Sequence, residues 1–424
     1  MGILSQMKNR QKITFPIQIL RGLATGALTA LAITLFALIV AKSTDLNKAH
    51  RILLLTIPLA AFLTTLLYKE VGERFRQGTN EAINDINKRD HGIQTLAKKE
   101  ARAVSPVMGL LACLSCAMTH ISGASGGKEG AGVQIGLACS SLVAQIENKI
   151  HDIAEDVDAM VTYLMCGAAA AFGALFSAPI SGVLFGTQFA SPRTTRLEAW
   201  LPCTISSFTA VLISKAIGIH IIQIPSISAL PFTLKNTLYV VVLSALIGFA
   251  ARLFCFILSK TKTFFTEHIK NQYMKSVSPA LVLLALTGIV YLLTGDFRYN
   301  GLGADLLLDA INGNFRNYDA LLKLVFVTLT FTASFSGGEV VPLLVIGSGL
   351  GAVFASVCGL EISGTAAIGA LAMLSGGTNL PLVCFALGLE LFGITEPILL
   401  FLATGISFIT SGKHGIYQTQ ISPY

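Results

Sequence analysis

The chain has 424 residues, of which 53% are hydrophobic and only 12% are charged, and its mean hydropathy is +0.70. Because soluble domains carry about 25% charged residues, this composition excludes a water-soluble fold, a disordered chain, a collagen-like repeat and a secreted disulfide scaffold. The formal net charge of +7 does not indicate nucleic-acid binding, since Lys and Arg in a membrane protein mainly report orientation.

The first elements in chain order are two membrane spans. Residues 1–14 contain three basic residues, which predict a cytoplasmic N-terminus. The apolar stretch at residues 15–41 is longer than the core of a cleavable signal peptide and reaches the ~20 residues that cross a bilayer. We therefore expect it to be a retained helix, followed by a second span at residues 51–68.

Two basic loops follow the same orientation rule. Residues 69–102 form the most polar part of the chain and, with residues 260–275, are expected on the cytoplasmic side. The acidic stretch from Glu147 to Asp158 is interpreted as a solvated loop.

From residue 104 onward the apolar segments become short and rich in glycine. Several cannot cross a ~30 Å hydrocarbon core at 1.5 Å per residue. Interrupted helices of this kind are tolerated only where they are buried or line a cavity, which is typical of a transport protein. The segments are residues 104–121, 131–146, 160–174, 178–190, 198–219, 236–258, 279–294, 321–335, 340–357, 362–374, 380–392 and 395–410.

Two motifs recur in the same order about half a chain apart. Residues 126–136 resemble residues 337–347, and residues 176–185 resemble residues 378–385. Such paired interruptions indicate a duplication and are a good sequence pointer to a transporter binding site. We therefore expect an all-α polytopic membrane protein of tilted and broken transmembrane helices, built from two related repeats that are inverted.

The first motif predicts an anion site around a carboxylate. Gly127 and Gly130 remove side chains from the backbone, and a helix starting beside Lys128 points unpaired N–H groups and a positive dipole end outward. Glu129 lies inside this site, so it could occupy the anion's place and leave when protonated. The alternative is a satisfied interhelical carboxylate, and Gly132 and Gly136 are interpreted as helix-packing glycines.

The second motif places Glu339 between Gly338 and the pair Val340 and Val341. Glu339 is the lone acid between residues 324 and 360, and intramembrane acids are functional by default. We interpret it as part of a proton path, with a helix-start acid at the membrane surface as the alternative. Tyr417, after the last apolar segment, could donate a hydrogen bond to an anion or simply lie at the membrane interface.

Other kinds of chemistry find little support. Cys113 and Cys116 form a C-x-x-C in apolar surroundings and are interpreted as buried hydrophobes, so no metal site or cofactor is expected. The seven histidines lie singly, and neither H-E-x-x-H nor G-x-S-x-G occurs. An integral-membrane enzyme is therefore disfavoured.

The ordered motifs Gly-Gly-Lys-Glu-Gly, Phe-x-Ala-Pro-x-x-Gly, Gly-Gly-Glu-x-x-Pro and Gly-Ile-Tyr resemble the CLC family of chloride channels and anion/proton antiporters, over about residues 20–420. This resemblance implies that Glu129 is the gating glutamate and that Tyr417 coordinates the central anion. The family has another loop that binds the anion, and the residues here that correspond best to it are Gly78, Thr79 and Asn80. It further implies a homodimer with a separate pore in each subunit.

Departures from the family pattern bear on the anion. Glu339 replaces a phenylalanine of the chloride-transporting members, as in the bacterial fluoride/proton antiporter branch. Gln188 and Phe189 stand where chloride/proton exchangers carry an inner proton glutamate. Val341 stands where the fluoride branch often has threonine, and Ala131 replaces a common proline, so the selectivity stays open.

These features predict fluoride export in exchange for protons, with Glu129 and Glu339 as the gating and proton-transfer residues. The candidate anion-binding residues are Thr79, Asn80, Gly127, Lys128, Gly130, Gly338, Val340, Val341 and Tyr417. The alternative is a chloride/proton exchanger or passive chloride channel of the same fold. We expect a single transport domain over residues 15–424, with halves near 15–220 and 235–420 and no C-terminal regulatory domain, in the lipid bilayer of a bacterial inner membrane.

Overall fold

The protein is described here by a computed structural model, which covers residues 15–76, 78–90, 104–151, 157–192, 196–218, 224–413 and 415–421. Across these ranges the chain forms sixteen α-helices, and its β pairing is one isolated bridge. The expected N-terminal segment, residues 1–14, and residues 91–102 of the first basic loop lie outside the described residues.

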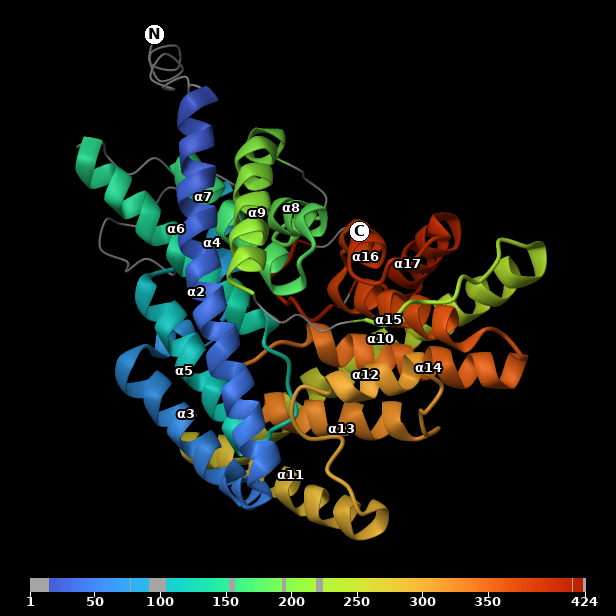
Figure 1. The fold of residues 1–424 in the computed structure, drawn as a ribbon. Helices are drawn as coiled ribbons and strands as arrows, with labels where there is room; N and C mark the ends of the chain where they lie inside the picture. The colour runs from blue at the N-terminus through green and yellow to red at the C-terminus, as the bar shows by residue number, and fades with distance from the viewer. Residues whose placement is uncertain are drawn as a thin grey trace.

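Eight helices form each half of the chain. The first half contains α2 (Phe15–Ala49), α3 (Ile57–Val71), α4 (Thr79–Asp90), α5 (Pro106–Ser122), α6 (Glu129–His151), α7 (Val157–Phe176), α8 (Pro179–Gln188) and α9 (Leu197–Ile217). The second contains α10 (Leu234–His268), α11 (Gln272–Thr294), α12 (Ala304–Ile311), α13 (Asp319–Thr332), α14 (Val340–Cys358), α15 (Ile362–Thr378), α16 (Pro381–Glu390) and α17 (Pro397–Ser411). Two short 3-10 helices, η1 (Arg51–Thr56) and η2 (Glu73–Phe75), flank α3. In Figure 1 most of the first half lies on the left and most of the second on the right.

The two halves repeat the same structure, as the sequence predicts. Each begins with a 35-residue helix, and α8 and α16 each have ten residues with proline at the start. Two residues before each proline the backbone is left-handed, at Ser177 (φ 49°) and Asn379 (φ 59°). The start of α8 meets the end of α16, because the carboxylate of Glu390 accepts hydrogen bonds from the N–H groups of Ile180 and Ser181 at 2.8 and 2.7 Å. This antiparallel contact is the arrangement that inverted repeats produce.

Helices α7 and α15 form the centre of the two halves. In α7, 94% of the candidate span is buried, and every residue of α15 from Gly364 to Thr378 is buried. Gly136 of α6 packs against the backbone of α7, and Gly347 of α14 packs in the same way against α15. Gly132 likewise leaves room for a leucine of α7. These contacts confirm that Gly132 and Gly136 serve helix packing.

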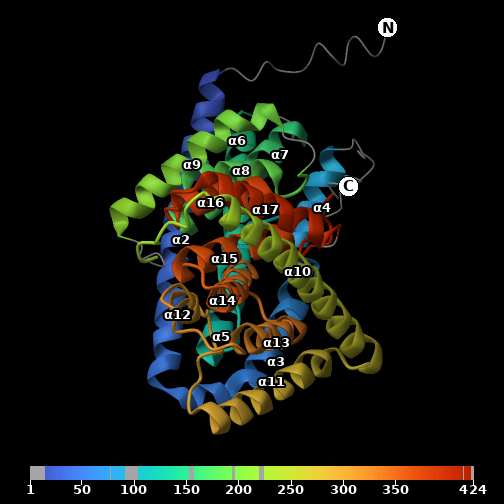
Figure 2. The ribbon, with the colours of Figure 1, turned by 90° about the vertical axis from the view of Figure 1, so that its right-hand side faces the viewer.

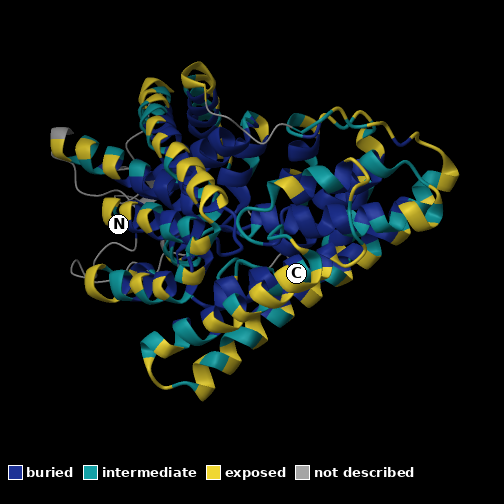
Figure 3. Ribbon diagram, turned by 60° about the horizontal axis from the view of Figure 1, so that its bottom comes forward, coloured by how far each residue is buried: buried dark blue, intermediate teal, exposed yellow. Residues whose placement is uncertain are grey.

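The outer helices expose apolar side chains. On α10 one stripe, including Leu243, Ile247 and Phe254, is buried, while the opposite stripe, including Leu246 and Phe249, is more than half exposed. Figure 2 shows α10 along the outside of the molecule, and Figure 3 shows exposed residues on the outward faces of the peripheral helices. Soluble proteins rarely expose apolar surface this widely. Seven helical segments in the described residues are long and apolar enough to cross a membrane, so the chain is a multi-pass membrane protein.

The polar segments differ in part from the prediction. Residues 69–102 contain α4, which buries Ala82, Ile83 and Ile86 on one face. The average polarity of this stretch hides that short apolar pattern, so the prediction of a continuous loop was wrong. The two basic loops do lie on one side of the molecule, because Lys69 donates a hydrogen bond to Tyr273 at 3.2 Å.

The interpretation of Glu147 as part of a solvated loop was also wrong. Glu147 lies near the end of α6, where its carboxylate forms an ion pair with Arg21 of α2 at 2.9 Å. It also accepts a hydrogen bond from Tyr163 of α7. The acid therefore ties three helices together, while residues 152–156 of the same stretch lie outside the described residues.

Candidate functional site: two paired helix starts

The loops that precede α6 and α14 meet at the middle of the molecule. Gly127 and Gly338 form an antiparallel bridge, with N–H to carbonyl distances of 2.8 and 3.0 Å. The N–H of Ala131, in the first turn of α6, donates to Gly337 at 3.0 Å. The repeated Gly-Gly motifs therefore join the two halves directly and place two helix starts side by side.

Close backbone approach explains two of the glycines. A Cβ on Gly127 would lie 2.5 Å from the carbonyl oxygen of Gly338, and a Cβ on Gly338 would lie 2.5 Å from the N–H nitrogen of Gly130. Side-chain carbons do not fit at such distances. A Cβ on Gly126 would meet its nearest neighbour at 3.6 Å, which is an ordinary contact, so space does not require the first glycine of the motif.

Each loop is held by the helix that precedes the other loop. Thr119 of α5 donates a hydrogen bond to the carbonyl of Ser336 at 2.7 Å, and Thr330 of α13 accepts one from the N–H of Ser125 at 2.9 Å. Both threonines lie at the corresponding position ahead of the bridged glycine in their own half. This reciprocal bracing fixes the two helix starts relative to each other.

The carboxylate of Glu129 lies between the two helix starts. Glu129 is the first residue of α6 and is 2% exposed. Its Oε2 accepts a hydrogen bond from the N–H of Lys128 at 3.1 Å, and the backbone N–H groups of Glu129 itself and of Val341 in α14 also interact with it. A carboxyl group therefore occupies the place at which both helices point their free N–H groups.

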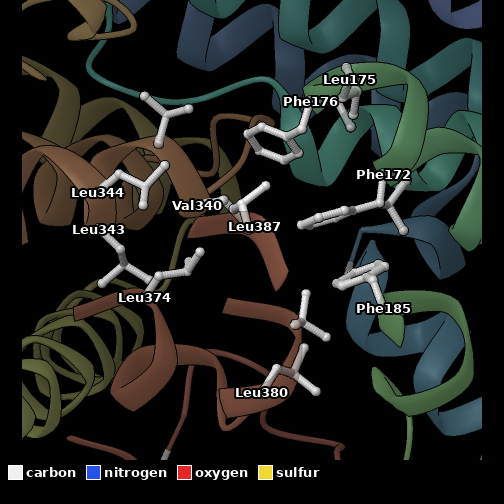
Figure 4. Packing of buried hydrophobic residues seen from close by; sticks show 14 of the residues in the cluster. Phe172, Leu175, Phe176, Phe185, Val340, Leu343, Leu344, Leu374, Leu380 and Leu387 are labelled. Carbon is white, nitrogen blue, oxygen red and sulfur yellow. The ribbon is translucent and has the colours of Figure 1, made fainter. Parts of the chain in front are cut away.

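Glu339 immediately precedes α14, where its side chain is half-buried and does not cap the helix. It interacts electrostatically with Lys262, which lies near the end of α10. Val340 and Val341, the first residues of α14, are buried. Figure 4 shows Val340 and Leu387 between the stacked rings of Phe172 and Phe185, 4.4 Å apart, and the leucines of α14 and α15.

Tyr417 lies within electrostatic range of both glutamates. Its segment, residues 415–421, packs back into the molecule: the N–H of Ile416 donates to Gly377 at 2.8 Å, and the N–H of Ile421 donates to Ala190 at 3.2 Å. The structure thus brings Glu129, Glu339 and Tyr417, which are far apart in the sequence, to one place.

Thr79 and Asn80 reach the same region at the start of α4. The hydroxyl of Thr79 is 3.5 Å from the carbonyl of Gly130, which it faces as a donor. The side-chain and backbone oxygens of Asn80 accept hydrogen bonds from Thr419, two residues beyond Tyr417. Thr79 therefore borders the start of α6, whereas Asn80 holds the segment that carries Tyr417.

The sequence interpretation missed Lys262. Leu258 and Cys255 lie four and seven residues before it, so a helical pattern places all three on the buried face of α10. That periodicity was available in the sequence, but the contact with Glu339 depends on how α10 crosses the second half. At the end of α8, Gln188 and Phe189 are both buried, and Phe189 stacks on Phe185 at 5.2 Å.

Paired helix starts inside an apolar bundle of inverted repeats, with carboxylates at both starts, define a polytopic membrane transport protein. The chain matches the voltage-gated chloride channel family over residues 60–412. It belongs to this family, whose abbreviation is CLC.

Individual relatives agree with this assignment. The "Chloride/fluoride channel protein" of Pseudomonas syringae pathovar tomato is 27% identical over 99% of this chain and 90% of its own. The H(+)/Cl(-) exchange transporter ClcA of Salmonella arizonae is 27% identical over 62% of this chain and 57% of its own. The crystal structure of a CLC-type fluoride/proton antiporter superposes with a TM-score of 0.85 at 26% identity, covering 96% of this chain and 99% of that one.

Proposed function

We propose that this protein exchanges fluoride for protons and exports fluoride as protons flow inward. The observation that carries the proposal is the position of the Glu129 carboxylate, which lies where the starts of α6 and α14 converge. A site that accommodates a carboxylate through backbone N–H groups suits a small anion. The site has no fixed cation directly bonded to the carboxylate among the described residues, which favours release.

The proposed cycle alternates Glu129 and the anion in one site. Protonated Glu129 loses its attraction to the helix starts and leaves, and fluoride takes its place at the backbone N–H groups of Lys128 and Val341. Gly130 and Val340 border this place, while Gly127 and Gly338 hold it open, because their own N–H groups are used in the bridge. Tyr417 donates its phenolic proton as a hydrogen bond to the anion. Glu339 exchanges protons on the inner side, beside Lys262.

Thr79 and Asn80 have different parts in this proposal. Thr79 can turn its hydroxyl from Gly130 toward an anion at the start of α6. Asn80 acts through Thr419 by holding residues 415–421 in place. We therefore expect substitution of Thr79 to change anion affinity and substitution of Asn80 to disturb the position of Tyr417.

The choice of fluoride is supported by Glu339 and by the relatives. A second acid stands just before α14, where the family resemblance implies a phenylalanine in chloride-transporting members, and one relative is named for fluoride as well as chloride. One structural neighbour that matches over nearly its full length is a fluoride/proton antiporter.

Chloride transport, by proton exchange or through a passive channel, is the second candidate. Val341 offers no hydroxyl at the anion site, and the chain is also similar to H(+)/Cl(-) exchange transporters. The two candidates differ in which anion moves and in whether protons move with it.

Anion efflux from proteoliposomes distinguishes them. Vesicles loaded with equal fluoride and chloride are diluted into a medium free of both, and each anion is followed with its own electrode. We expect rapid fluoride efflux with external alkalinisation and little chloride efflux. Chloride efflux equal to or faster than fluoride efflux would assign the protein to the second candidate.

We also propose a homodimer with one pore in each subunit, inserted in a bacterial inner membrane with the N-terminus in the cytoplasm. The basic residues of the loops around Lys69 and Tyr273, which contact each other, support this orientation. Chemical crosslinking of the detergent-solubilised protein at low concentration tests the assembly, and a monomeric band alone would contradict it. One transport domain over residues 15–424 carries the activity.

A further inference from the structure

A cavity of about 330 Å³ lies at the far end of α2 from Arg21 and Glu147. Thr44, Asn47 and Arg51 line one side, and the segment between α11 and α12 lines the other. Asn47 donates a hydrogen bond to the carbonyl of Ile121 at 2.9 Å, so the cavity lies at the end of α5. With the N-terminus in the cytoplasm, this end of α2 faces outward.

His120, in the last turn of α5, forms the inner wall of this cavity. The side chain is 1% exposed, and its Nε2 has no hydrogen-bond partner among the described residues. Its Nδ1 lies 3.5 Å from the hydroxyl of Thr44. Burying an imidazole nitrogen without a partner is unfavourable, so Nε2 is left available for a transient partner such as a water molecule, while Nδ1 lies on the side of Thr44, which lines the cavity.

The other side of His120 faces the glycine loop. The imidazole interacts with the backbone of Gly127 and electrostatically with Lys128 and Lys323. One turn earlier on the same helix, Cys116 interacts with Glu129. His120 therefore stands between the cavity and the loop that leads to the Glu129 carboxylate.

Basic and acidic residues line the cavity together, and most of them are paired: Lys48 with Asp305 at 2.8 Å, and Arg298 with Asp309 and Asp319 at 2.7 and 3.2 Å. The charged residues of the cavity wall are Lys48, Arg51, Arg298, Asp296 and Asp305. Behind the wall, Lys323 is fully buried and donates to the hydroxyl of Ser125 at 2.8 Å and to the carbonyl of Gly301 at 2.9 Å. Among the described residues it has no carboxylate partner within 4.0 Å, and through Ser125 it holds the loop before Glu129.

We propose that this cavity is the outer access to the anion site and that His120 relays protons between the cavity water and Glu129. Water in the cavity gives a proton to the neutral imidazole, and the imidazolium then passes one proton to the Glu129 carboxylate, directly or along water. The imidazole returns to its neutral form, so one proton moves inward and the water that gave it is left as hydroxide, which makes the outer medium more alkaline. The relay deepens the proposed fluoride/proton exchange and rests on it.

Chemical rescue tests the relay. Fluoride efflux is measured at equal internal and external pH for wild type, His120→Ala, His120→Gln and His268→Ala, the last being an exposed histidine at the end of α10. We expect both His120 variants to slow efflux by about a hundredfold, the lower end of what a positioned proton-transfer group contributes, and His268→Ala to match wild type. Imidazole should restore His120→Ala, because the cavity admits it, and the similarly shaped weak base pyrazole should not.

The outcomes separate the relay from the exchange itself. If the wild type transports fluoride and both His120 variants do so at the same rate, the relay is overturned and the proposed function stays intact. The relay would also be overturned if the His120→Ala protein runs at normal size on gel filtration, has slow fluoride efflux, and does not recover that efflux when imidazole is added. No coupled exchange in the wild type would overturn both proposals.

Discussion

Glu129 and its neighbouring glycines show how far single residues can be interpreted. The sequence predicts a carboxylate at a glycine-rich helix start, and the structure places that carboxylate between two such starts. What the sequence could not separate is the role of each glycine. Gly127 opposes a carbonyl of the other half, whereas Gly126 has ordinary space around it. That difference depends on a contact between residues more than 200 positions apart.

Replacing Glu129 by Gln should abolish proton coupling, because the amide cannot release or accept the transported proton. We expect proton movement linked to fluoride to fall by about a hundredfold or more, as for removal of a positioned acid–base group. Paired fluoride and pH electrodes on proteoliposomes provide the measurement. Glu267→Gln, at an exposed position near the end of α10, is the control, and unchanged coupling in Glu129→Gln would refute the role of Glu129.

Gly127→Ala should be destabilising and Gly126→Ala should not. The added methyl group at Gly127 forces the paired loops apart, at a cost of about 1–3 kcal/mol for an overpacked site. Thermal unfolding of the detergent-solubilised proteins compares the two variants directly, and fluoride efflux shows whether the anion site survives. Equal stability of the two variants would contradict the close approach of Gly127 to Gly338.

At the scale of elements, the duplication was predictable and the cross-bracing was not. Every apolar segment expected from residue 104 onward falls on a helix, because hydrophobic runs and their glycine or proline ends are local signals. The short helices α4 and α12 were missed, since α4 has few apolar positions and α12 has only eight residues, too few for a clear pattern. The hydrogen bonds of Thr119 and Thr330 to the opposite loop are not encoded in any local pattern.

Glu390 provides a test of how the two halves are joined. Its carboxylate accepts hydrogen bonds from the start of α8, including one from the hydroxyl of Ser181 at 2.6 Å. Hydrogen bonds to a charged group are worth about 1.5–3 kcal/mol, so Glu390→Ala should lower the thermal midpoint clearly. Glu396→Ala is the matched control, because Glu396 precedes α17 without capping it. A Glu390→Ala protein as stable as the control would show that this contact does not hold the halves together.

At the scale of the whole molecule, α2 relates the two membrane sides to the site. Its beginning is tied to α6 through Arg21 and Glu147, and its end is tied to α5 through Asn47. The paired helix starts lie between these two levels, because the loop that follows α5 comes from the level of Asn47 and α6 then runs to the level of Arg21. Composition alone predicted the membrane, but only the fold relates its two sides to Glu129.

Cysteine labelling tests the orientation. His50→Cys and Lys270→Cys place thiols at exposed positions, after α2 and between α10 and α11 respectively. With a membrane-impermeant maleimide on intact cells, we expect the first to react and the second to react only after permeabilisation. Wild type, with its eight native cysteines, gives the background. The reverse pattern would place the N-terminus outside.

The central claim is that fluoride and protons move in opposite directions through one coupled cycle. Its most direct test is an outward fluoride gradient across proteoliposomes, with the membrane potential held near zero by potassium and valinomycin and with the interior more acidic than the medium. The account predicts that fluoride efflux drives protons inward against their gradient, so that the interior acidifies further. Fluoride leaving without proton uptake, or no fluoride movement at all, would contradict it.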